Sequence, residues 1–152
     1  MQSTDPGGAL GRVDPAALVS SVDFLMTVMA ELIGASTPGL PEALDRVVAL
    51  LGVYTDVDRV GLVRIDHDRL TMELEHSWHS DRVGPDYTAS KSLPLAEQPG
   101  LTDRLRKKLI ITTNDSEDMA PELASDQTSL RRRGIRANAV VPVVLGEDLH
   151  GL

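Results

Sequence analysis

The chain contains no cysteine and few aromatic residues, with one Trp, two Tyr and one Phe among 152 residues. The absence of cysteine excludes disulfides, thiolate metal ligands, cysteine nucleophiles and thioether-linked cofactors. The few aromatic side chains leave little material for stacking on nucleic-acid bases. Positive charge is also scarce, because 15 Lys and Arg stand against 23 Asp and Glu, a formal net charge of −8. Since phosphate contacts depend on Lys and Arg, this composition argues against a nucleic-acid-binding protein.

The sequence also lacks a long hydrophobic run. Its longest stretch of this kind, Ala139–Leu145, is interrupted by Pro142, whereas a membrane helix needs about 20 apolar residues. No positively charged start followed by an apolar core marks a secretory signal. With 41% hydrophobic and 25% charged residues, the composition is that of a soluble globular domain. We therefore expect a cytoplasmic protein with no membrane contact.

Catalytic and metal-binding signatures are missing as well. The sequence shows no Ser-His-Asp order, no phosphate-cradling glycine loop and no H-E-x-x-H element. Its four histidines are scattered, without ligand spacing or an accompanying carboxylate cluster, which predicts no metal site and disfavours a haem ligand. The expected protein is not an enzyme.

The N-terminal region predicts a tail followed by one long helix. Residues 1–13 carry few apolar anchors, so we expect a disordered tail before a single domain at residues 14–152. Asp14 offers an N-cap and Pro15 a first helical position for a helix that runs to Ile33. Apolar residues follow at alternating steps of four and three, the spacing of a coiled-coil seam. This proposed dimer interface comprises Leu18, Val22, Leu25, Met29 and Leu32. A helix that covers the core of a monomer is the alternative.

The next segment predicts a helix and two strands. Pro41 opens an amphipathic helix that Gly52 would end, and Val60–Ile65 reads as a buried strand. After the turn at residues 66–69, strict alternation over Leu70–Trp78 predicts a second strand with two distinct faces. One face would carry Leu70, Met72, Leu74, His76 and Trp78. The other would carry Thr71, Glu73, Glu75, Ser77 and His79.

The remainder alternates short helices and strands. Helices are predicted at 99–108 and 121–133, the second closed by Gly134, and extended segments at 92–95, 109–113, 137–145 and 149–152. Adjacent strands indicate a largely antiparallel sheet with helices on its faces, an α+β fold.

This order and four local strings resemble a GAF domain, the small-molecule sensor module of bacterial signalling proteins. The strings are "LPEALDRVVALLGVYTDVDRVGLVRID", "MELEHSWHS", "PLAEQPGL" and "RRRGIRANAVVPVVLGEDLHGL". The resemblance implies a PAS-related, mostly antiparallel central sheet, of which the last strand and a C-terminal helix would be missing. Similar domains that attach a bilin or reduce methionine sulfoxide need cysteine, so both activities are excluded. Cyclic-nucleotide-binding relatives use a Phe, whereas the single Phe here is Phe24, which disfavours that ligand.

The resemblance places a pocket between the sheet and its covering loops. His76 and Trp78 could stack on a planar ligand there or hydrogen-bond to it, although plain core packing is the alternative. The expected ligand-binding residues are Leu74, His76, Trp78, Tyr87, Leu101, Leu105 and Ile111. Their apolar members could instead fill the pocket completely. Nothing in the sequence identifies a cofactor.

Two basic runs and one acidic run remain. "RLRKK" at 104–108 and "RRRGIR" at 131–136 could meet phosphates or an acidic partner, but each ends a predicted helix, where cations complement the dipole. "NDSED" at 114–118 reads as a solvated turn.

The sequence thus predicts a regulatory domain of a signal-transduction protein, which couples an unidentified small molecule to a dimeric helical output. The alternative is a ligand-free dimerisation scaffold. A cavity below the size of about one water would favour the scaffold, and one of a few hundred Å³ the sensor.

Overall fold

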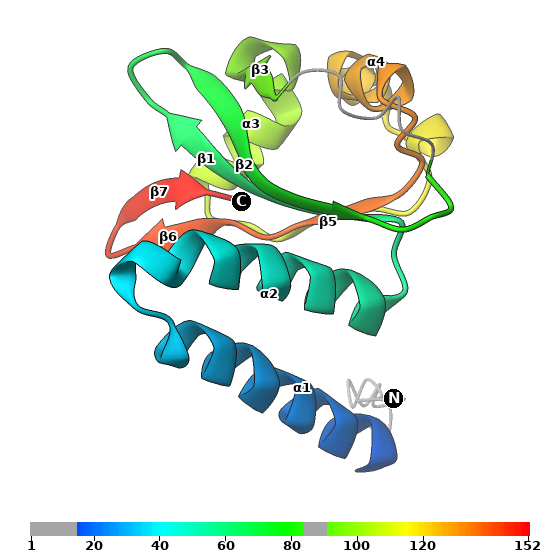
Figure 1. Cartoon of the computed structure of the whole chain (residues 1–152). Helices are drawn as coiled ribbons and strands as arrows, with labels where there is room; N and C mark the ends of the chain where they lie inside the picture. The colour runs from blue at the N-terminus through cyan, green and yellow to red at the C-terminus, as the bar shows by residue number, and fades with distance from the viewer. Residues whose placement is uncertain (1–14, 84–90) are drawn as a thin grey trace, which may run out of the picture.

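A computed structural model describes residues 15–83 and 91–152 of the chain, and its helices and strands build four layers (Figure 1). The outermost layer is α1 (Pro15–Gly34), which packs on α2 (Leu40–Thr55) after the short 3₁₀ turn η1 (Thr37–Gly39). Helix α2 covers one face of the central sheet, and α3 (Pro99–Arg106) and α4 (Ala124–Arg132) lie on the other side.

The central sheet has five strands in the order β3-β2-β1-β7-β6, and β4 and β5 form a separate pair. All strand pairings in both sheets are antiparallel. This agrees with the α+β fold predicted from the sequence. The strands are β1 (Arg59–Asp66), β2 (Thr71–His79), β3 (Ser92–Pro94), β4 (Ile111–Thr113), β5 (Asn138–Val140), β6 (Val143–Leu145) and β7 (Asp148–Gly151). Single 3₁₀ turns separate several elements, namely η3 (Leu95–Glu97), η4 (Ser116–Asp118) and η5 (Pro121–Leu123).

Two hydrophobic clusters lie between the sheet and α3, and α2 buries Ala43, Val47 and Val48 as well. One buried cluster joins the strands β1, β2 and β3, and a second joins α3 to the β4–β5 pair. Three partly buried residues, Leu101, Leu149 and Leu152, pack against both clusters. The core is therefore continuous from α3 through β7 to the middle of the sheet.

Helix α2 continues past Gly52, contrary to the predicted stop at this glycine. The helix ends at Thr55, where Asp56 adopts a left-handed conformation with φ of 50°. Gly52 is buried inside the helix, and a Cβ placed on it would overlap the indole ring of Trp78. The glycine is needed for the close approach of β2 to α2, because any side chain would push the ring away.

We expect Gly52→Ala to destabilise the fold by about 1–3 kcal/mol, because the methyl group must displace the Trp78 ring. Trp78 is the single Trp of the chain, so its fluorescence emission should shift to longer wavelength in the variant. Gly34→Ala is the matched control, since a Cβ there has nothing within 4 Å. Equal stability of the two variants would contradict the close packing of Gly52 on Trp78.

A β-bulge breaks the predicted alternation of β2. Leu62 pairs with His76, but the next residue, Val63, pairs with Leu74, so no residue of β1 lies directly opposite Glu75. Directly opposed residues of an antiparallel pair share a face, and Leu62 and Val63 lie on opposite faces. His76 and Leu74 therefore lie on opposite faces, and the prediction of a single face from Leu70 to Trp78 is wrong.

The bulge has a direct consequence for His76 and Trp78. Trp78 packs on Gly52, and Nδ1 of His76 lies 2.7 Å from Oδ1 of Asp45, both on α2. Met72 belongs to the buried cluster on the side of α3. The first part of β2 therefore faces the main core, while its last part holds α2 on the sheet.

Candidate functional site

A small cleft, lined by apolar as well as polar side chains, lies between α3, α4 and the β4–β5 pair. Its volume is about 30 Å³, roughly twice the 10–15 Å³ that one water molecule needs. It is lined by Gln98, Leu101, Arg104, Ile111, Thr113, Met119, Leu123, Asp126, Leu130 and Asn138. The cleft can hold a ligand group of a few heavy atoms.

Asp126 connects α4 to the start of α3. Its two carboxylate oxygens accept hydrogen bonds from the backbone N–H groups of Gly100 (3.0 Å) and Leu101 (2.8 Å). These N–H groups belong to the first turn of α3, which has no partner for them within the helix. The carboxylate satisfies both donors and complements the positive end of the helix dipole. Asp126 is buried, so this contact fixes one wall of the cleft.

Gly100 allows this approach. A Cβ at Gly100 would overlap a methyl group of Leu123 and come within 3.0 Å of the Asp126 carboxylate. The glycine therefore lets the N-terminus of α3 meet α4 directly.

Other polar side chains complete the inner surface of the cleft. Gln98 is buried, and its Nε2 donates a hydrogen bond to Oγ of the buried Ser129 at 3.2 Å. Asn138 and Thr113 lie directly opposite each other on β5 and β4. Oδ1 of Asn138 is buried and has no hydrogen-bond partner among the described residues.

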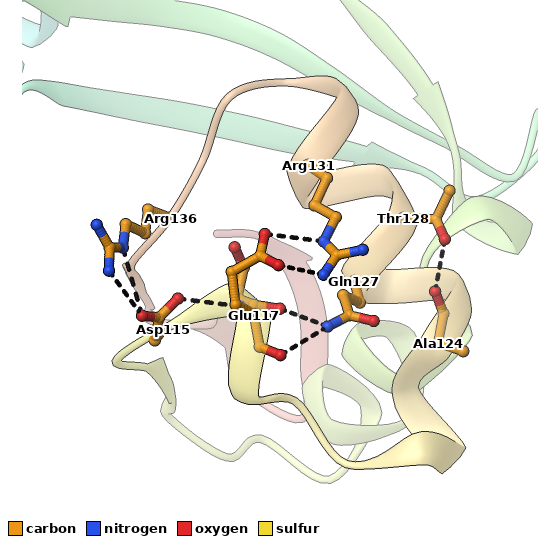
Figure 2. A network of polar contacts seen from close by, with 8 residues as sticks. Asp115, Glu117, Ala124, Gln127, Thr128, Arg131 and Arg136 are labelled. Atoms are coloured by element: carbon orange, nitrogen blue, oxygen red, sulfur yellow. Dashed lines mark hydrogen bonds and ion pairs between the residues drawn. The ribbon is translucent and has the colours of Figure 1, made fainter.

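A network of ion pairs holds the outer side of α4 (Figure 2). Glu117 forms a bidentate ion pair with Arg131, and Asp115 accepts from Nη2 of Arg136 at 3.1 Å. Nε2 of Gln127 donates to the carbonyl oxygens of Ser116 (2.7 Å) and Glu117 (3.2 Å). The acidic run at 114–118 and the basic run at 131–136 therefore pair with each other. The run is a turn with Asn114, Glu117 and Asp118 exposed, as predicted, and two of its carboxylates are ion-paired as well.

Asp115 accepts hydrogen bonds from the backbone N–H of Glu117 and from the guanidinium group of Arg136, and both bonds lower the pKa of its carboxyl group. A carboxylate with a lowered pKa in the folded state stabilises the fold at neutral pH. This contribution is lost as the pH falls through the lowered pKa, below about pH 4. Hydroxyl groups of Thr71 and Ser92 lower the pKa of Glu73 in the same way.

We therefore expect the free energy of unfolding to fall between neutral pH and about pH 3, and to fall less in Asp115→Asn. Urea denaturation at both pH values measures the difference. Asp148→Asn, at the exposed first position of β7, is the control and should keep the wild-type difference. If Asp115→Asn shows the full wild-type loss, this carboxylate does not contribute to acid sensitivity.

The structure brings only some of the predicted ligand-binding residues together. Leu101 and Ile111 line the cleft, and Leu105, exposed to only 1%, packs on Ile111 behind it. Leu74 lies on the same side of the sheet but does not line the cleft. His76 and Trp78 lie against α2 on the opposite face, and Tyr87 lies outside the described residues.

The residues that sequence reasoning missed are the polar ones, namely Gln98, Asp126 and Asn138. Asp126 carried a usable signal, because it shares one face of its helix with Leu130 four positions later. A carboxylate on an apolar helix face indicates a buried partner. Gln98 and Asn138 carried no comparable signal.

The predicted dimer residues of α1 are largely exposed. Val22, Leu25 and Met29 are each more than half exposed, Leu32 is half-buried, and the side chain of Leu18 lies outside the described part. A neighbouring face of α1 holds α2, where Phe24 stacks on Tyr54 with ring centroids 4.0 Å apart. Phe24 thus lies in the helical layers, away from the cleft.

No helix in the described part of the chain has the length and apolar character that a membrane crossing requires. No group of three or more His, Asp or Glu side chains is placed to hold a metal ion in residues 15–83 and 91–152.

Comparison with known proteins identifies the fold. The chain resembles the phycocyanobilin-bound GAF domain of a cyanobacterial phytochrome (TM-score 0.68, 16% identity, 86% of this chain and 75% of that one). It also resembles the GAF domain of an Acinetobacter phosphoenolpyruvate-protein phosphotransferase (TM-score 0.61, 18% identity, 86% and 72%). The chromophore-binding domain of Stigmatella aurantiaca phytochrome P1 gives a TM-score of 0.69 at 15% identity, covering 94% of this chain and 52% of that one.

No individual curated protein matches the sequence. The family model described as "GAF domain" matches residues 39–152, which include α2, the whole sheet and the cleft. GAF domains are sensory and regulatory modules of signalling proteins. On this match and on its fold, the chain belongs to the GAF domain family.

Proposed function

We propose that this GAF domain is a non-catalytic regulatory module of a cytoplasmic signalling protein, which pairs with a second copy through α1. In this proposal the state of the cleft between α3 and α4 biases the arrangement of the paired helices. Such coupling requires a pairing surface, a site and a physical connection between them.

The observation that carries the proposal is an apolar stripe along α1. Its five residues are Val22 (52% exposed), Leu25 (58%), Met26 (62%), Met29 (51%) and Ile33 (77%). They recur at helical spacing on one side of the helix. The other side of α1 is held on α2 by the Phe24–Tyr54 stack and by an ion pair between Glu31 and Arg46 at 2.7 Å. A helix anchored in this way presents its stripe to a partner.

A continuous packing route supports coupling to the cleft. Leu101 lines the cleft and also contacts both core clusters, which reach Ile65 and Met72 in the sheet. The same strand β2 then contacts α2 through His76 and Trp78. A rearrangement at the start of α3 therefore has a path of packed side chains to α2 and α1.

A ligand-free scaffold is a second candidate, favoured by the small size of the cleft. A volume of about 30 Å³ lies far below the several hundred Å³ of sites for drug-sized ligands. The bilin named for the cyanobacterial relative is not proposed for this chain, because the cleft is small and the chain has no cysteine for a thioether.

Native mass spectrometry of the purified chain at micromolar concentration tests the proposal, because it reports oligomeric state and retained ligand together. The proposal expects a species of twice the 16.4-kDa chain mass. A dimer without any bound ligand would favour the scaffold. A monomer at all micromolar concentrations would contradict both candidates.

A further inference from the structure

An exposed apolar patch lies where the chain passes from α3 into β4. Ile110 (67% exposed) directly precedes β4, and Val141 (56% exposed) directly follows β5. The end pair of these strands, Ile111 with Val140, is buried against α3, so side-chain alternation turns the next residue of each strand away from this cluster. Leu109 (49% exposed) extends the patch along the chain. Adjoining exposed apolar side chains mark interaction sites, whereas isolated ones are normal.

Two cations without ion-pair partners precede this patch in the chain. Arg106 and Lys108 are exposed, and in the described part of the chain neither side chain forms an ion pair or a hydrogen bond. Lys107, between them, is already paired with Asp103 at 2.7 Å. The end of α3 thus keeps uncompensated positive charge beside apolar side chains, although the whole chain has a net charge of −8.

Lys108 also adopts a backbone conformation that is costly for a lysine. Its φ is 57°, in the left-handed region that glycine normally occupies after a helix. Two hydrogen bonds hold this turn, from the N–H of Lys108 to the Leu105 carbonyl (2.8 Å) and from the N–H of Leu109 to the Arg104 carbonyl (3.1 Å). They form a Schellman motif in which lysine replaces the usual glycine. A strained residue that carries an unpaired charge points to a role for that charge.

We propose that the basic–apolar patch, formed by Arg106, Lys108, Leu109, Ile110 and Val141, docks an acidic amphipathic helix of a partner protein. The apolar stripe of the helix covers Ile110 and Val141, and carboxylates beside that stripe pair with Arg106 and Lys108. An anionic membrane is disfavoured, because the net charge of −8 is repelled by an extended negative surface, whereas one helix meets mainly the local cations. The inference goes beyond the proposed pairing, since no residue of the basic–apolar patch belongs to α1.

Nuclear magnetic resonance of the full ¹⁵N-labelled chain tests the inference. The probe is a synthetic helical peptide with Leu at helical spacing on one face and Glu on the other. We expect saturable shifts of the backbone amides of Lys108, Ile110 and Val141. One reference peptide carries Lys in place of Glu and another Ser in place of Leu, and both should bind much more weakly. No saturable shift, or equal binding of the Lys peptide, overturns the inference.

Vesicles of phosphatidylcholine and phosphatidylserine are the second probe. The proposal expects no sedimentation of the chain with them. Sedimentation with the vesicles, combined with no binding of the acidic peptide, would identify a lipid surface and overturn the inference.

Two substitutions in the basic–apolar patch sharpen the test. Ile110→Glu places a carboxylate in its middle and should raise the dissociation constant of the acidic peptide at least about tenfold. Leu70→Glu makes the same change of charge at an exposed apolar position just before β2 and should bind as the wild type. Lys108→Gly should weaken binding about threefold without lowering the melting temperature, because glycine suits the left-handed turn.

Wild-type binding by both Ile110→Glu and Lys108→Gly overturns the inference. The α1 stripe is checked with Leu25→Glu, Met29→Glu, which should bind the peptide as the wild type does. If this double variant loses the peptide while Ile110→Glu retains it, the peptide binds α1 and the inference is overturned.

Discussion

Replacing Asp126 with alanine is expected to destabilise the chain by about 2–4 kcal/mol, the largest effect of any single polar substitution in the cleft. The substitution leaves the N–H groups of Gly100 and Leu101 without their acceptor. It also removes a buried side chain that holds α3 against α4. Thermal denaturation followed by circular dichroism should show a melting temperature lower by roughly 5–15 °C.

Asp103→Ala is the matched control for this prediction. Asp103 also belongs to α3 and forms an ion pair with Lys107 at 2.7 Å, but its side chain is 61% exposed. Exposed pairs of this kind contribute about 0–1 kcal/mol. Equal melting temperatures for the two alanine variants would show that Asp126 does not hold the start of α3.

The second large effect is expected on association. The double variant Leu25→Glu, Met29→Glu places two carboxylates in the middle of the α1 stripe, where a paired helix would have to bury them. We expect the dissociation constant of the dimer to rise at least about 100-fold, since burying an unpaired charge costs several kcal/mol. Because both residues are more than half exposed in the single chain, the fold of each copy should be unaffected. Sedimentation velocity across a concentration series measures the change.

Thr27→Glu is the control for the stripe. Thr27 is exposed on α1, and its hydroxyl donates only to the Asp23 carbonyl of its own helix. The glutamate there should leave association unchanged. If Thr27→Glu and the double variant weaken the dimer equally, the effect comes from charge alone and the stripe is not the interface.

Local sequence signals predicted most of the fold. Prolines near helix starts, helical spacing of apolar residues and short extended runs gave the order of the helices and of the strands up to β4, and the left-handed Gly134 (φ 64°) follows α4. The single strand expected at 137–145 is instead two strands, β5 and β6, in different sheets, and the helix expected from Pro121 begins at Ala124 after η5. The antiparallel sheet followed from adjacent strands. These features depend on residues close together in the chain, which a sequence pattern reports directly.

The errors came from contacts between distant residues. The β-bulge at Glu75, which has no residue of β1 directly opposite it, depends on the register of β1, so the alternation of β2 by itself could not show it. Gly52 looked like a helix stop because its real role, close packing on Trp78, involves a residue 26 positions later. The ion pairs of the acidic run were not predictable either, because Arg131 and Arg136 approach it only in the folded chain.

The sequence predicted only some of the residues that line the cleft, for the same reason. Leu101 and Ile111 were predictable as inward-facing apolar residues of short elements. Asn138 lines the cleft because β5 pairs with β4, which places it opposite Thr113 and near α4. Such a convergence of β4, β5 and two helices has no signature in any one segment.

The most direct test of the account is disulfide cross-linking through a single introduced cysteine. The natural chain has none, so Leu25→Cys places one thiol on each copy, near the middle of α1, where two paired helices approach in either orientation. Under mild oxidation the account predicts rapid formation of a disulfide-linked dimer by Leu25→Cys and little by Thr27→Cys. Equal cross-linking at the two positions, or none at Leu25→Cys, would contradict pairing through the α1 stripe.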